Sequence, residues 1–136
     1  MEVIMSEALF LKRVFLADAA TCAACAALLL AGAGALSPLL GLPYPLLFWA
    51  GAALVPVAAL FAFIGTRQRP PVALAVIGIL GNVLWVVESA ITIEMVAGIT
   101  TLGIAFVAMQ AAAVAVLAAL ETWGLRRMQA ARVSAA

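Results

Sequence analysis

The chain has 136 residues, of which 68% are hydrophobic and 10% are charged, and seven basic residues nearly balance six acidic ones for a net charge of +1. Average soluble domains are about 45–50% apolar and about 25% charged, so these few ionisable side chains cannot cover the surface of a water-soluble domain. The composition therefore indicates a membrane protein, and the small net charge excludes the basic surface that nucleic-acid binding requires.

Four apolar runs have the length of about 20 residues that crosses a hydrocarbon core of about 30 Å. In chain order they cover residues 14–36, 44–65, 71–91 and 102–120. Short polar or proline-containing segments separate them, as expected for neighbouring antiparallel helices. The sequence predicts an all-α protein: an integral membrane antiparallel four-helix bundle that forms one domain over residues 1–136.

The first run has two interpretations. A cleaved signal peptide would use the small residues 31–35 as its cleavage site. However, Asp18 interrupts the hydrophobic part, and Glu2 and Glu7 lie in the segment before it. We therefore expect the first run to be a retained membrane helix.

A polar face also occurs in this first run. Its members recur at spacings of three and one residues, which place them on one side of a helix; they are Asp18, Thr21, Cys22 and Cys25. We expect this face to turn toward protein, with Asp18 paired to Lys12, Arg13 or a cation on another helix.

Cys22 and Cys25 form a C-x-x-C pattern, which in other proteins marks a redox pair or half of a metal site. A reactive thiolate needs a nearby cation or base, but the chain has no histidine and the nearest ionisable group on this face is Asp18. A zinc ion would also lack a fourth ligand. We therefore expect inert thiols, no metal and no cofactor, with a membrane thiol redox protein as a weaker alternative.

The third run carries a polar stripe. At about 100° per residue its members fall within an arc of about 120°, and the remaining positions are branched aliphatic residues suited to lipid. The stripe consists of Gly78, Gly81, Asn82, Trp85, Glu88, Ser89 and Thr92. We expect it to face the protein interior.

Glu88 is the most informative residue of this stripe. A carboxyl group within a membrane usually marks an ion or proton pathway, a ligand counter-charge or a polar packing contact. Trp85, one turn earlier, would form an aromatic wall suited to an organic cation, and a tryptophan packed in the core is the alternative for this residue. Asn82, Ser89 and Thr92 would complete the polar lining of this candidate proton or solute site. The alternative for Glu88 is a carboxylate that reaches water at the interface.

The fourth run has a seam of small residues at alternating steps of three and four. It consists of Ala105, Ala108, Ala112, Ala115 and Ala119, and such a seam allows close approach of another helix. Gln110 points about 180° away from it. Gln110 and Asn82 lie at similar depth, so a direct hydrogen bond between them is one expectation. That pair would turn Gln110 inward and leave the alanine seam as a face for self-association.

The positions of the basic residues predict the orientation. All of them lie before the first run, between the second and third, or after the fourth; they are Lys12, Arg13, Arg67, Arg69, Arg126, Arg127 and Arg132. Because Lys and Arg stay on the cytoplasmic side, both termini are predicted to be cytoplasmic.

Three segments carry a family resemblance. They are residues 42–69 with the run Leu-Pro-Tyr-Pro-Leu-Leu-Phe-Trp, the Asn-Val-Leu-Trp-Val-Val run from Asn82, and residues 102–127 ending in Leu-Arg-Arg. In them the chain resembles small four-span bacterial inner-membrane proteins of unassigned function. The resemblance implies a multi-pass protein of the bacterial inner membrane and no particular activity. Small multidrug-resistance transporters are similar only in architecture, since their essential glutamate lies in the first helix, where this chain has Asp18.

Nucleotide-binding glycine motifs, nucleophile elbows and zinc-protease patterns do not occur in the sequence. The leading prediction is a non-enzymatic membrane protein with a structural or accessory role, which associates with itself or with a larger membrane partner. The alternative is a small proton-coupled transporter or binder of hydrophobic or cationic solutes that uses Glu88. The lipid bilayer is the expected partner, and no particular small-molecule ligand is predicted.

Overall fold

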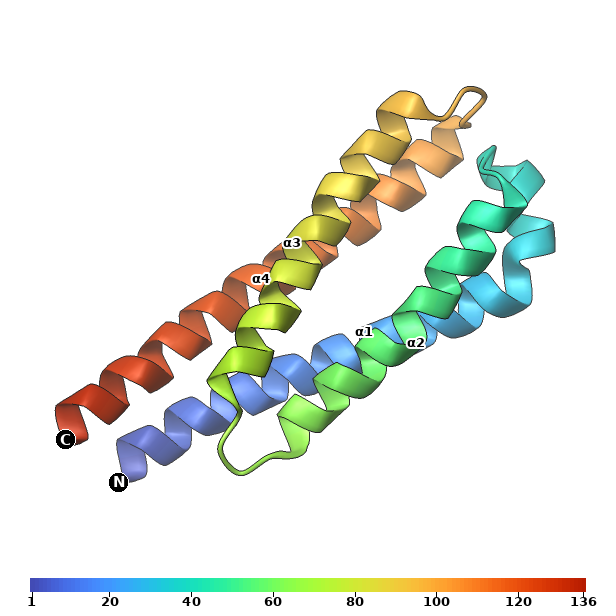
Figure 1. The fold of residues 1–136 in the computed structure, drawn as a ribbon. Helices are drawn as coiled ribbons and strands as arrows, with labels where there is room; N and C mark the ends of the chain where they lie inside the picture. The colour runs from blue at the N-terminus through green and yellow to red at the C-terminus, as the bar shows by residue number, and fades with distance from the viewer.

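The computed structural model describes residues 1–136 and contains four helices and no strands. The helices are α1 (Glu2–Leu40), α2 (Tyr44–Thr66), α3 (Val72–Met95) and α4 (Thr101–Ala135) (Figure 1). This confirms the predicted all-α four-helix bundle. By length and composition, all four helices are suited to cross a membrane, so the chain is a multi-pass membrane protein on that criterion.

Two helices are longer than the predicted spans. The first span was predicted over residues 14–36 and the last over residues 102–120, but α1 begins at Glu2 and α4 continues to Ala135. Helix formation depends on backbone hydrogen bonds and residue propensities, whereas a span search follows hydropathy and stops where the sequence becomes polar. The two polar extensions pack together, since Arg127 Nη2 donates to Glu7 Oε1 at 2.7 Å and the ring centroids of Phe10 and Trp123 are 5.1 Å apart.

The helices are arranged as two hairpins. Helix α1 packs along α2 and α4, α3 packs against α4, and α2 touches α3 only sparsely. Figure 1 shows both termini and the α2–α3 turn at one end of the molecule, with the other two turns at the opposite end. The chain segments that carry the basic residues therefore share one end of the bundle. The bundle is open on the side between α2 and α3.

Close helix contacts depend on small residues. The rings of Phe15 and Phe61 have centroids 5.5 Å apart and lie in the core. A Cβ atom at Gly78 would lie 2.7 Å from the Phe61 ring, so α3 approaches this pair only because residue 78 is glycine. Gly78 in this way brings the polar stripe of α3 close to Phe15 of α1.

The α1–α2 and α3–α4 turns are joined to each other. The Thr100 backbone N–H donates to Leu40 O at 3.0 Å, and the Thr100 hydroxyl donates to Leu39 O at 2.9 Å. Gly41 has φ +66°, a left-handed conformation that favours glycine. A Cβ at Gly103 would collide with Leu40 O. These contacts hold the end of α1 against the start of α4.

Replacing Gly103 by alanine is expected to destabilise the protein by about 2 kcal/mol, because the new methyl group has no space beside the α1 carbonyl. Gly34→Ala is the matched control, since nothing lies within 4 Å of a Cβ there and alanine favours the helix. Unfolding in mixed micelles, followed by circular dichroism, measures both variants. Equal unfolding midpoints for Gly103→Ala and Gly34→Ala would contradict the close contact between Gly103 and Leu40 O.

Candidate functional site

The candidate residues divide into two groups in the structure. One group lines a cavity that opens between α2 and α3; it consists of Trp85, Glu88, Ser89, Thr92 and Gln110. The second group forms a buried polar cluster between α1, α3 and α4; it consists of Asp18, Cys22 and Asn82, together with Glu121. The five candidates of the third span are therefore divided, with Asn82 apart from the other four.

The first group lines a cavity of about 540 Å³. We call it the lateral cavity. Its walls are mainly apolar and come from all four helices, including Leu29 of α1, Trp49 of α2 and Phe106 of α4. It lies near the end of the bundle that is remote from the termini, where α2 and α3 do not close against each other. A cavity of this size and lining suits a small apolar or amphipathic molecule.

A chain of hydrogen bonds fixes the polar wall of the lateral cavity. Trp85 Nε1 donates to Gln110 Oε1 at 2.7 Å, and Gln110 Nε2 donates to Ser89 Oγ at 2.9 Å. The Ser89 hydroxyl in turn donates to Trp85 O at 2.7 Å. Gln110 thus links α4 to α3 and holds the indole ring of Trp85 in the wall.

Glu88 is the charged residue of the lateral cavity. It is exposed on the outside of the bundle, and its carboxylate takes part in no hydrogen bond or ion pair, while its backbone carbonyl accepts from Thr92 Oγ1 at 2.9 Å. The Thr92 hydroxyl is therefore directed toward its own helix. The cavity offers one unpaired negative charge beside apolar and aromatic walls.

The second group is completely enclosed. Asp18 and Glu121 are each 0% exposed, and Asn82 is 4% exposed. The Asn82 amide donates from Nδ2 to Asp18 Oδ2 at 2.7 Å and to Glu121 Oε2 at 3.0 Å. The Cys22 thiol donates to Asp18 Oδ1 at 3.4 Å. We call Asp18, Asn82 and Glu121 the buried triad.

Three expectations about these polar residues were wrong. Asn82 does not bond to Gln110, because Asn82 lies at the level of Glu121 along α4, whereas Gln110 lies at the level of Trp85 and Ser89 along α3. Asp18 has no cation as a partner, since its carboxylate accepts from Asn82 and Cys22 and the one salt bridge joins Arg127 to Glu7. Thr21 does not share the inward face of α1; it is exposed and its hydroxyl donates to Ala17 O.

Sequence reasoning also missed Glu121. The predicted span ended at residue 120, which left Glu121 outside the helix. A signal was present, because eleven residues make just over three helical turns and so place Glu121 on the same face as Gln110. Continuing the helical periodicity past the end of the apolar run would have identified it.

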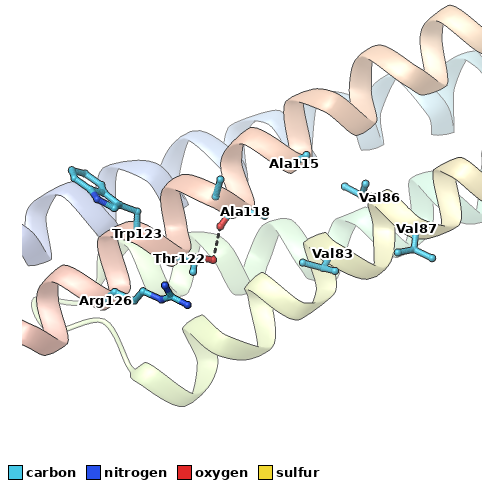
Figure 2. Close-up of a pocket in the computed structure, with 9 residues that line it drawn as sticks. Val83, Val86, Val87, Ala115, Ala118, Thr122, Trp123 and Arg126 are labelled. Carbon is cyan, nitrogen blue, oxygen red and sulfur yellow. Dashed lines mark hydrogen bonds between the residues drawn. The ribbon is translucent and has the colours of Figure 1, made fainter.

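The alanine seam lies on the outside of α4. All five of its members are exposed, whereas Gln110 is directed inward. Beside the seam, a groove of about 530 Å³ lies between α3 and α4 (Figure 2). Val83 and Val87 of α3 line it opposite Ala115 and Ala119, and Arg126 lies at one end. The close-up shows the Thr122 hydroxyl bonded back to Ala118 O, so this polar group is satisfied within α4.

The two cysteines are free, with Cys22 buried and Cys25 at the wall of the lateral cavity. No group of three or more His, Cys, Asp or Glu side chains is arranged to hold a metal ion. The polar side chains of both groups are held by hydrogen bonds to one another.

Comparison of the chain with protein-family models, with curated proteins and with solved structures found no match.

Proposed function

We propose that this chain is a non-enzymatic membrane protein that binds hydrophobic cationic solutes in the lateral cavity, with Glu88 as the counter-charge. The observation that carries the proposal is the unpaired Glu88 carboxylate on the wall of an apolar cavity of about 540 Å³. The Trp85 ring adds an aromatic surface, and aromatic faces attract organic cations. A proton and a cationic solute would compete for the same carboxylate, which is the requirement for proton-coupled transport.

The opening between α2 and α3 supports lateral entry of the solute. Helices α2 and α3 touch only sparsely, and large apolar side chains such as Trp49 and Leu46 are exposed near the cavity. A hydrophobic solute dissolved in lipid would reach the cavity without crossing a polar barrier.

Glu88→Gln tests this proposal. Binding of tetraphenylphosphonium, a hydrophobic cation, to the purified protein in detergent is expected to weaken about tenfold, because the variant loses the counter-charge at the wall of the lateral cavity. Glu94→Gln is the matched control on the same helix, since Glu94 is exposed and does not line the lateral cavity. Isothermal titration calorimetry measures both. Equal affinities for wild type and Glu88→Gln would exclude Glu88 as the counter-charge.

A structural or accessory role is the second candidate, favoured by the exposed alanine seam of α4. In this role the chain associates with a second copy or with a larger membrane protein through close helix packing. Replacing Ala112 by phenylalanine is expected to reduce self-association, measured by single-molecule subunit counting in lipid bilayers. A wild-type protein that is strictly monomeric at all protein-to-lipid ratios would remove self-association from this candidate.

We also propose a location in the bacterial inner membrane with both termini in the cytoplasm, as for the small four-span proteins that the chain resembles. The grouping of the basic segments at one end of the bundle supports this orientation.

A further inference from the structure

The buried triad lies outside the lateral cavity, since none of its three residues lines that cavity. It joins three helices, with Asp18 on α1, Asn82 on α3 and Glu121 on α4. Both carboxyl groups are fully enclosed. An enclosed carboxylate is stable only when a cation, a proton or sufficient hydrogen-bond donors compensate its charge.

The triad has too few donors for two carboxylates. The Asn82 amide supplies two N–H groups and the Cys22 thiol supplies one S–H, whereas the carboxylates present four oxygen atoms with two lone pairs each. Three of these oxygens accept a bond from Asn82 or Cys22. The fourth, Glu121 Oε1, is buried and has no hydrogen-bond partner. One donor is missing at this atom.

No basic side chain supplies the missing charge. The groups that contact the pair are Cys22 from α1 and the uncharged Asn82 from α3. Helix α2 contains no acidic or basic residue. On α4, Arg127 is bound to Glu7 and Arg126 is exposed in the outer groove. Two negative charges would therefore stand side by side in the interior.

We propose that Asp18 and Glu121 form a proton-binding site that holds one shared proton at neutral pH. The two carboxyl groups are neighbours, because the single Asn82 Nδ2 atom donates to both Asp18 Oδ2 and Glu121 Oε2. A proton on Glu121 Oε1 turns this orphaned acceptor into an O–H donor toward the Asp18 carboxylate, and it reduces the charge of the pair from two to one. The Asn82 amide bridges both carboxyl groups and holds them in this arrangement.

The site connects proton binding with helix packing. Loss of the shared proton leaves two adjacent charges at the contact of α1, α3 and α4, which drives these helices apart or admits water. Asn82 lies one turn from Trp85, so a movement of α3 at the triad also moves a wall of the lateral cavity. The proton site itself does not depend on the solute site, because Glu88 takes no part in it.

Infrared spectroscopy of the purified wild-type protein tests the site, because a protonated carboxyl group gives a carbonyl band separate from that of a carboxylate. Four of the six acidic residues are outside the triad: Glu2, Glu88 and Glu94 are exposed and Glu7 is ion-paired. We expect a protonated-carboxyl band at neutral pH equivalent to about one proton per chain, which disappears on sufficient alkalinisation. Absence of the band at neutral pH would overturn the proposal without any variant.

Three variants assign the band. Glu121→Gln and Asp18→Asn each leave one carboxylate with added amide donors, so the band at neutral pH should be lost in both. Glu88→Gln should retain it fully, which separates this site from the proposed solute site. Circular dichroism establishes that the variants remain helical. A band that persists in both triad variants, or that sodium ions remove from the wild type at constant neutral pH, would overturn a proton site at this pair.

Discussion

Replacing Asn82 by leucine is expected to destabilise the protein by about 3 kcal/mol, the largest effect that we predict for a single substitution. Leucine keeps the branched shape of the asparagine side chain but has no hydrogen-bond donor. Both Asp18 Oδ2 and Glu121 Oε2 therefore lose their amide donor inside the bundle. Unfolding in mixed micelles, followed by circular dichroism, measures the free energy.

Two controls make this prediction specific. Val83→Leu changes an exposed residue next to Asn82 and should have little effect. In a Glu121→Gln background, the effect of Asn82→Leu should fall to about half, because the introduced glutamine amide can donate to Asp18 in place of Asn82. An equal loss of stability in both backgrounds would show that Asn82 acts through packing and not through the two carboxyl groups.

Gln110→Leu is expected to weaken tetraphenylphosphonium binding about tenfold and to lower the free energy of unfolding by about 1–2 kcal/mol. The substitution leaves Trp85 Nε1 without an acceptor and Ser89 Oγ without a donor. The indole ring is then free to leave the wall of the lateral cavity, which removes its contact with the cation.

Gln129→Leu is the control for this substitution, because Gln129 is exposed on the same helix and does not line the lateral cavity. Calorimetric titration and micellar unfolding measure both variants. If Gln110→Leu loses stability but binds the cation as tightly as wild type, Gln110 stabilises the bundle without positioning Trp85. That result would remove the Trp85 wall from the proposed solute site.

The sequence alone determined the class of the protein and the number of its helices. Hydropathy and length were sufficient for this, because a span of about 20 apolar residues must form a helix in lipid to satisfy its backbone groups. Periodicity within one helix also placed Trp85 and Ser89 on an inward face of α3, and these residues line the lateral cavity. Hydropathy did not predict where α1 begins and where α4 ends, since polar residues continue both helices beyond the apolar runs.

Only the tertiary structure decided which polar side chains meet. Periodicity gives the direction of each side chain around its own helix axis, but a contact between helices depends on their relative rotation and axial shift. These quantities follow from packing, such as the approach of α3 at Gly78 and the joined turns at Thr100. They bring Asn82 to Asp18 and Glu121 instead of to Gln110. The buried triad is therefore a property of the assembled bundle, because its three members lie on three separate helices.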